Sequence, residues 1–216
     1  MTFTLNIDEE IASLKTDIVR MASLCEKALY FVSSLVDGKE RDLRDIQELS
    51  DQIEKSEREI EQECMRILLR RHPVAKDLRS VSAALRIITD LERIGNNSLD
   101  LAEAINYCEN RDILQEIELP KMIEEVSKML TDATDAFVMR NEEKAEAVIR
   151  EDDVLDALFV TAKEGLIRMI KSSVDGIEEA PDALLAAKYL ERMGDHCVNL
   201  SRQLIWSVSG DMNLQP

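Results

Sequence analysis

The stretch Asp90-Leu-Glu-Arg-Ile-Gly-Asn-Asn97 recurs 99 positions later as Tyr189-Leu-Glu-Arg-Met-Gly-Asp-His196. A repeat over this distance indicates that one structural unit is used twice along the chain. Burial alone can account for the repeated Leu and for the Ile or Met. It accounts less easily for the repeated Glu-Arg pair and the Gly, so these polar and small residues are candidates for a second role.

The composition of the chain predicts an all-α protein. Of 216 residues only 6 are Gly and 4 are Pro, and aromatic residues make up 4%. Ala, Leu, Glu, Arg, Ile and Met, most of which are good helix formers, fill the remaining positions. The chain is long enough to bury a sizeable core as one large domain or two small ones.

The net charge of −17 disfavours a nucleic-acid partner, because an acidic surface repels phosphate backbones. It suits cations or a basic protein surface, and simple solubility explains it equally well. The four cysteines lie far apart without a Cys-x-x-Cys motif, which argues against a zinc ribbon and fits reduced thiols in the cytosol. The first residues do not resemble a signal peptide, and no apolar run approaches the ~20 residues that cross a bilayer. We therefore expect a cytoplasmic protein, peripheral to the membrane at most.

Apolar periodicity predicts six long helices, arranged as two tandem three-helix bundles related by a pseudo-twofold axis. The first bears an unbroken heptad seam from Ile11 to Leu35, between a capping box of Asn6 and Glu9 and a stop at Asp37-Gly38. The others are expected over residues 42–70, 75–107, 119–137, 142–172 and from 181 onward, with a linker over 108–118, a loop over 174–180 and a frayed tail over 207–216. The two repeats are placed at residues 1–110 and 111–216. Helices of about 30 residues would be about 45 Å long, so we expect an elongated body.

Carboxylates follow the repeated motif at helical spacing. Two stripes at i, i+4 and i+8 consist of Glu191, Asp195 and Asn199 in the second repeat and Glu92, Asn96 and Asp100 in the first. Preceding helices supply Asp51 and Glu54, which match Asp153 and Asp156. Antiparallel packing could bring Asp153 and Asp156 against Glu191 and Asp195. Four such carboxylates favour a hard cation such as Mg, Ca, Mn or iron.

Other interpretations of the same residues stay open. Acidic pairs at i, i+4 are often simply solvated, and Arg93 and Arg192 could pair with acids of a neighbouring helix to fix the packing. Gly95 and Gly194 cost about 1 kcal/mol each relative to Ala, which indicates close helix approach or space for an ion. His196 is either a metal ligand or a hydrogen-bonded packing residue. Without a Glu-x-x-His motif, a P-loop or a Gly-x-Ser-x-Gly motif, the sequence does not indicate an enzyme.

With these motifs the chain resembles the PhoU family of phosphate-uptake regulators. The resemblance rests on Arg71-His-Pro-Val-Ala-Lys-Asp-Leu-Arg79 leading into Asp90–Gly95, and on Tyr189–His196 with Asn199. It implies paired three-helix bundles and acidic clusters that bind metal, including multinuclear iron in some members. It also implies a homodimeric negative regulator of phosphate uptake and of the phosphate-starvation response. The implied partners are the ATPase subunit of a phosphate ABC transporter and a sensor histidine kinase.

The chain departs from the family pattern at Asn96 and Asn97, where Asp and often His are expected. Asn is neutral and binds hard cations more weakly, so we expect weaker or absent metal binding in the first repeat. Two alternatives remain beside the regulator: a metal-binding or storage module, and a helical scaffold without a signalling role, whose stripes are salt bridges.

Overall fold

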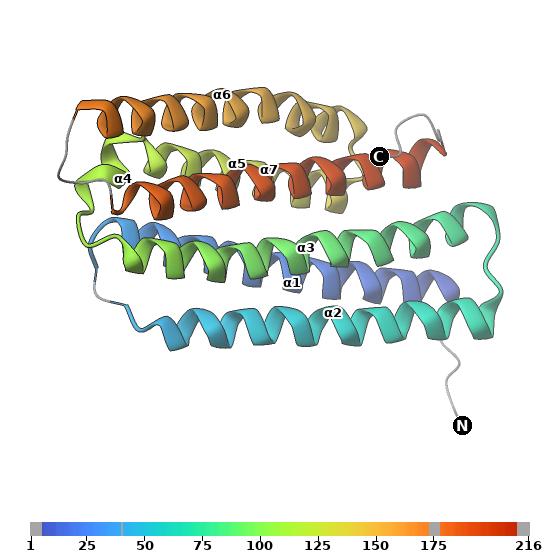
Figure 1. Cartoon of the computed structure of the whole chain (residues 1–216). Helices are drawn as coiled ribbons and strands as arrows, with labels where there is room; N and C mark the ends of the chain where they lie inside the picture. The colour runs from blue at the N-terminus through green and yellow to red at the C-terminus, as the bar shows by residue number, and fades with distance from the viewer. Residues whose placement is uncertain (1–5, 40, 173–177, 211–216) are drawn as a thin grey trace.

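The computed structural model describes residues 6–39, 41–172 and 178–210 of the chain, and within them all regular structure is helical. The helices are α1 (Ile7–Val36), α2 (Leu43–Arg71), α3 (Ala75–Tyr107), α4 (Asp112–Glu116), α5 (Leu119–Met139), α6 (Glu142–Ser172) and α7 (Ala180–Ser209). α1–α3 form one bundle and α5–α7 the other (Figure 1). The predicted all-α fold of two three-helix bundles is confirmed. None of the helices in the described residues is long and apolar enough to cross a membrane.

Helix ends follow the local sequence signals. The backbone N–H of Asn6 donates to Glu9 Oε2 at 2.9 Å, which completes the capping box that begins α1. α2 ends at Arg71, and its C-cap residue His72 adopts a left-handed conformation (φ 48°) directly before Pro73. Asn141 caps α6, because its Oδ1 accepts from the Lys144 N–H at 3.0 Å.

Two segments differ from the sequence-based expectation. The expected linker over 108–118 contains the short helix α4, whose apolar residues Ile113 and Leu114 are buried. The expected frayed tail begins too early, since α7 continues to Ser209 and ends at Gly210 with φ 77°. Most of the loop expected over 174–180 and the last six residues lie outside the described residues.

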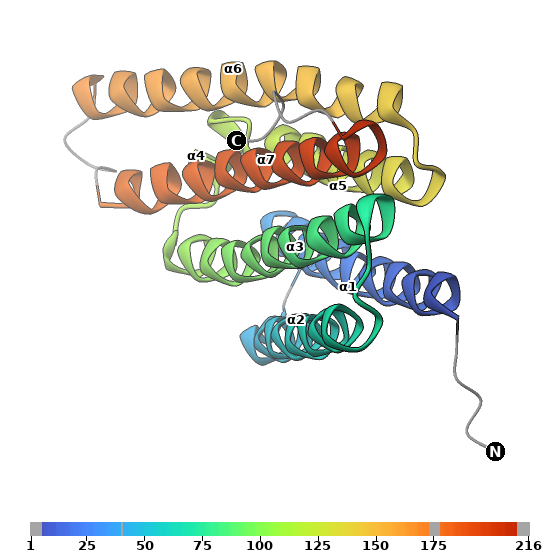
Figure 2. The same ribbon diagram turned by 90° about the vertical axis from the view of Figure 1, so that its right-hand side faces the viewer.

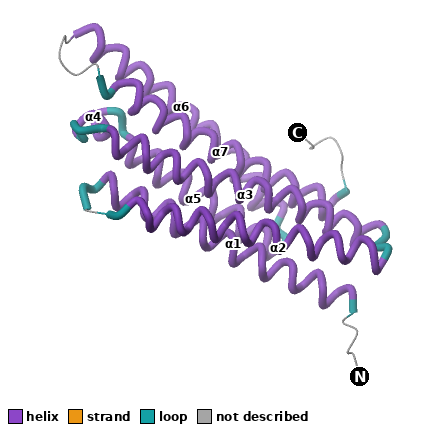
Figure 3. Tube along the Cα trace, turned by 60° about the horizontal axis from the view of Figure 1, so that its bottom comes forward, coloured by secondary structure: helices purple, strands orange, loops and turns teal. Residues whose placement is uncertain are grey.

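The two bundles meet along α3 and α7, with a second contact between α1 and α5. α3 and α7 run in opposite directions along the middle of the molecule (Figure 1), and the view turned by 90° places them at the same boundary (Figure 2). The body is elongated along the helix axes, as expected (Figure 3). This places the two copies of the repeated motif beside each other.

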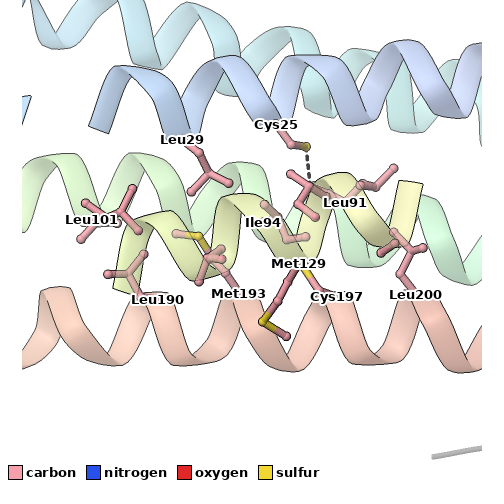
Figure 4. Close-up of a cluster of buried hydrophobic side chains, with 14 of the residues drawn as sticks. Cys25, Leu29, Leu91, Ile94, Leu101, Met129, Leu190, Met193, Cys197 and Leu200 are labelled. Atoms are coloured by element: carbon pink, nitrogen blue, oxygen red, sulfur yellow. Dashed lines mark hydrogen bonds between the residues drawn. The ribbon is translucent and has the colours of Figure 1, made fainter. Parts of the chain in front are cut away.

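The bundles share one hydrophobic core. Buried side chains of both repeats form a single cluster, and Figure 4 shows Leu91 and Ile94 of α3 facing Met193 and Cys197 of α7. The packing across the α3–α7 boundary therefore joins the buried side chains of the two repeats. All four cysteines are free and buried, and burial raises the pKa of the Cys64 thiol to about 12, which keeps it protonated and unreactive.

Candidate functional site

The repeated glycines allow a neighbouring helix to approach closely. A Cβ on Gly95 would lie 2.8 Å from Ile53 Cδ1 of α2. A Cβ on Gly194 would overlap Leu155 Cδ2 of α6 and lie 3.1 Å from Asp152 Oδ1. Close helix approach, one of the two roles considered for these glycines, is therefore present in both repeats.

The glycine contacts also set which residues of α2 and α6 are equivalent. Ile53 in the first repeat takes the place of Leu155 in the second. In this register Asp51 matches Asp153 and Glu54 matches Asp156, as the sequence pairing assumed. The register adds a further pair, Ser50 and Asp152, one position earlier in each helix.

In the second repeat four carboxylates of α6 and α7 lie in one patch, which we call the carboxylate cluster: Asp152, Asp156, Glu191 and Asp195. Burial raises the pKa of Asp152 to about 6, with further contributions from the negative charges of Asp156, Asp195 and Glu191. The pKa of Asp195 is raised for the same reasons, burial first and then Glu191. These residues repel one another in the folded chain.

Sequence reasoning missed Asp152 and selected its neighbour Asp153. Asp153 is exposed and is the weakest contributor to the pKa of Asp152, although the two are adjacent in sequence. Asp152 is half-buried beside Gly194, where it faces the acids of α7. The contact between Gly194 and α6 is the signal that identifies it, and that contact is not visible in the Asp-x-x-acid spacing.

The carboxylate cluster is acidic but is not arranged around one ion. Within the described residues no group of three or more His, Cys, Asp or Glu side chains is placed to hold a metal. Glu191 instead pairs with Lys188 of the same helix. The donors are nonetheless all carboxylate oxygens, the ligands that hard cations prefer, and after burial their mutual repulsion contributes to the raised pKa of Asp152.

The first repeat has hydrogen-bonded neutral side chains at two of the equivalent positions. The Ser50 hydroxyl donates to Asn96 Oδ1 at 3.2 Å, and Asn96 Nδ2 donates to Glu92 Oε1 at 2.6 Å. The two positions equivalent to Asp152 and Asp195 are therefore both uncharged. Weaker metal binding in the first repeat stays a prediction that rests on these two uncharged positions.

The remaining predicted residues of the first repeat do not converge with Glu92. Asp51 accepts from Gln47 Nε2 at 2.9 Å, and Glu54 pairs with Arg58 at 3.3 Å, in each case within α2. Asp100 is exposed on α3; burial raises its pKa, and the positive charge of Arg192 opposes that change.

A further acid, Glu57 of α2, lies near Glu92. Its pKa is raised by burial and then by Glu61 and Glu92. Glu57 lies outside the Asp-x-x-acid spacing that pairs Asp51 with Glu54.

His196 connects the two repeats. Its Nδ1 lies 2.9 Å from Asp90 Oδ1, so α7 and α3 are joined by a hydrogen bond between the first residue of one motif and the last residue of the other. This is the packing role considered for His196. Arg93 lies 3.5 Å from Glu92 of its own helix rather than from an acid of a neighbouring helix.

A cleft adjoins the carboxylate cluster where α3, α6 and α7 meet. It offers about 510 Å³ of space for water. Its lining consists of Arg93, Asn97, Asp152, Arg192, Asp195, His196, Val198, Asn199 and Arg202. Asn199, predicted as a possible ligand, therefore lies in the same cleft as Asp152 and Asp195.

Comparison with known proteins agrees with this architecture. The PhoU domain matches residues 18–105 and again 119–204. A relative from Clostridium acetobutylicum, described as a phosphate-specific transport system accessory protein PhoU homolog, is 31% identical over 94% of each chain. A relative from Pseudomonas aeruginosa with the same description is 32% identical, over 93% of this chain and 84% of its own length.

Solved structures give the same result. The crystal structure of PhoU from Pseudomonas aeruginosa superposes with a TM-score of 0.88 at 29% identity, covering 95% of this chain and 100% of its own. The phosphate transport system regulatory protein PhoU from Streptococcus pneumoniae, at 22% identity, shares the fold with a TM-score of 0.86 over 96% of this chain and 99% of its own. With two PhoU domains, relatives above 30% identity along nearly its whole length and the same pair of bundles, the chain belongs to the PhoU family.

Proposed function

We propose that the protein is a cytoplasmic, non-enzymatic negative regulator of phosphate uptake and of the phosphate-starvation response. The observation that carries this proposal is the match along both repeats to proteins described as accessory to phosphate-specific transport. The expected partners are the ATPase subunit of a phosphate ABC transporter and a sensor histidine kinase at the inner face of the membrane. The protein is expected to act as a homodimer.

Deletion of the gene in the source organism tests the regulatory role. Loss of a negative regulator should raise both phosphate uptake and phosphatase expression in phosphate-replete medium, and the intact gene on a plasmid should restore both. If uptake and phosphatase expression stay at wild-type values in the deletion strain, the regulatory role is wrong.

We further propose that the second repeat binds a hard cation, such as iron, Mn or Mg. Asp152, Asp156, Glu191 and Asp195 would hold it, and Asn199 at the neighbouring cleft could add an amide oxygen. The support is chemical, since all donors but one are carboxylates, and the carboxylates of Asp156, Asp195 and Glu191 add to the effect of burial in raising the pKa of Asp152. Asp156 is exposed, so its side chain can rotate toward an ion. The bound cation would offset the repulsion between α6 and α7.

Two alternatives predict different results for the variant that carries both Glu191→Ala and Asp195→Ala. A metal store would lose bound metal while phosphate regulation stays intact. A plain scaffold would show a lower melting temperature and no change in metal content, because its acids act only as ion-pair partners. The proposed regulator with a functional cation site would lose metal and regulation together.

A further inference from the structure

The cleft beside the carboxylate cluster contains equivalent residues from both repeats. Arg93 of α3 and Arg192 of α7 occupy the same position of the repeated motif, and both line it. Asn97 and His196 form a second equivalent pair in the lining. Equivalent residues of both repeats therefore meet in this cleft, which we call the arginine cleft.

The lining of the arginine cleft carries one more basic than acidic side chain, although Glu92 pairs with Arg93 and Asp156 and Glu191 lie beside its aspartates. Three arginines, Arg93, Arg192 and Arg202, stand against two aspartates in its lining, whereas the whole chain carries a net charge of −17. The net negative charge of the whole chain repels anions at long range, so a surplus of arginines in one cleft is a feature that an anion-binding role would account for.

The two equivalent guanidinium groups are accessible to a ligand. The Arg93 side chain is 60% exposed, and its ion pair with Glu92 is long at 3.5 Å. Arg192 is also exposed, on the opposite side of the α3–α7 boundary. The amides of Asn97 and Asn199 add neutral donors to the lining. Planar guanidinium groups bind tetrahedral oxyanions in a bidentate manner, and amide N–H groups complete such sites.

The two aspartates explain why an anion would need a cation beside it. Asp152 and Asp195 line the same cleft, and as ionised carboxylates they repel a phosphate oxygen. A cation on these residues removes that repulsion and presents a further positive charge to the ligand. Binding of cation and anion would then be mutually favourable, as thermodynamic linkage requires.

We propose that the arginine cleft binds inorganic phosphate between Arg93 and Arg192, beside the cation held by Asp152 and Asp195. The metal dependence of this binding rests on the proposed cation site, whereas the contact with the arginines does not. A phosphate in this position touches α3 of the first repeat and α7 of the second. It would therefore stabilise the boundary between the bundles and couple their arrangement to the phosphate concentration.

Equilibrium dialysis of the full chain against radiolabelled phosphate tests the proposal, in chloride buffer with either Mn²⁺ or a chelator. We compare the wild type with Arg93→Gln, Arg192→Gln and, as a matched control, Arg168→Gln, whose side chain is 71% exposed on α6 away from the cleft lining. We expect at least tenfold weaker binding in each cleft variant, no change in the control, and at least tenfold weaker binding by the wild type in chelator. Circular dichroism melting checks that each variant folds, and Arg192→Lys, which keeps the charge but not the planar fork, should retain part of the affinity.

The results separate this proposal from the cation site. Arginine-dependent phosphate binding that is equal with and without Mn²⁺ supports the anion site and contradicts the proposed cation site. Bound metal without phosphate binding at millimolar concentration overturns the anion site alone. Equal affinity in the cleft variants and the control also overturns it. Glycerol 1-phosphate distinguishes a phosphate ester from the free ion: if the ester binds and inorganic phosphate does not displace it, inorganic phosphate is the wrong ligand.

Discussion

Replacement of Asp152 by Asn should stabilise the metal-free protein at alkaline pH. The folded chain raises the pKa of Asp152 from an ordinary value of 3.8 to about 6, through burial and the neighbouring acids. A difference of about two pKa units corresponds to about 3 kcal/mol. Because Asp152 is only half-buried, solvent screening reduces this cost, and we expect about 1 kcal/mol.

The sign of the effect follows from proton linkage. A raised folded-state pKa means that the folded chain binds the proton more tightly than the unfolded chain, so the ionised carboxylate destabilises the fold. The cost is fully present above pH about 6 and disappears as the pH falls toward about 4. Asp152→Asn should therefore exceed the wild type by about 1 kcal/mol at pH 8 and by almost nothing near pH 4.

Urea unfolding in chelator at pH 8, 7, 6, 5 and 4 measures this difference. Asp153→Asn is the matched control, because it removes the same charge from the adjacent exposed position and should change stability by less than about 0.5 kcal/mol. Saturating Mn²⁺ should reverse the order, since only the wild type keeps the ligand. An Asp152→Asn protein that is no more stable at pH 8, or whose advantage persists unchanged at pH 4, would refute the reasoning.

Four further variants test the packing and the asymmetry of the repeats. Gly194→Ala should lower the free energy of unfolding by about 1–2 kcal/mol in urea titrations, because the overlap of the new Cβ with Leu155 outweighs the gain of about 1 kcal/mol from replacing a helical Gly. Gly95→Ala should lower it less, because the overlap with Ile53 is smaller; equal effects of the two variants would contradict the packing argument. The double variant Ser50→Asp, Asn96→Asp places acids in the first repeat at the positions that Asp152 and Asp195 occupy in the second. Elemental analysis should then find one more bound metal per chain, and unchanged metal content would contradict the proposed role of these positions. His196→Asn should remove the hydrogen bond between α7 and α3 and lower stability by about 1 kcal/mol, and thermal melting equal to that of the wild type would show that this bond contributes nothing.

Local signals in the sequence predict most of the helices. The capping box at Asn6 and the break at Pro73 depend only on neighbouring residues. The start of α1 and the end of α2 can therefore be predicted from the sequence. The short helix α4 was missed because five residues are too few to show a period, and burial of Ile113 and Leu114 against other helices stabilises it. The extension of α7 to Ser209 was missed because apolar spacing weakens there, although Gly210 marks its end.

The candidate site shows a similar division. Glu191 and Asp195 lie within one helix, so spacing alone places them on one stripe. Asp152 lies on a different helix, α6, and faces them across the contact between α6 and α7. Whether Asp152 or Asp153 faces α7 depends on where Gly194 allows α6 to approach. The shared core between α3 and α7 was hidden for the same reason, because periodicity gives the buried face of a helix but not the helix that covers it.

Metal content tests the central claim of an asymmetric pair of repeats most directly. We would dialyse the wild type and the variant carrying Asp152→Asn and Asp195→Asn against Mn²⁺ or iron, and then measure bound metal by elemental analysis, with Asp153→Asn as the control. The account predicts metal in the wild type and in the control and its loss in the double variant. Equal metal content in the double variant and the wild type, or no metal in any of the three proteins, would contradict it.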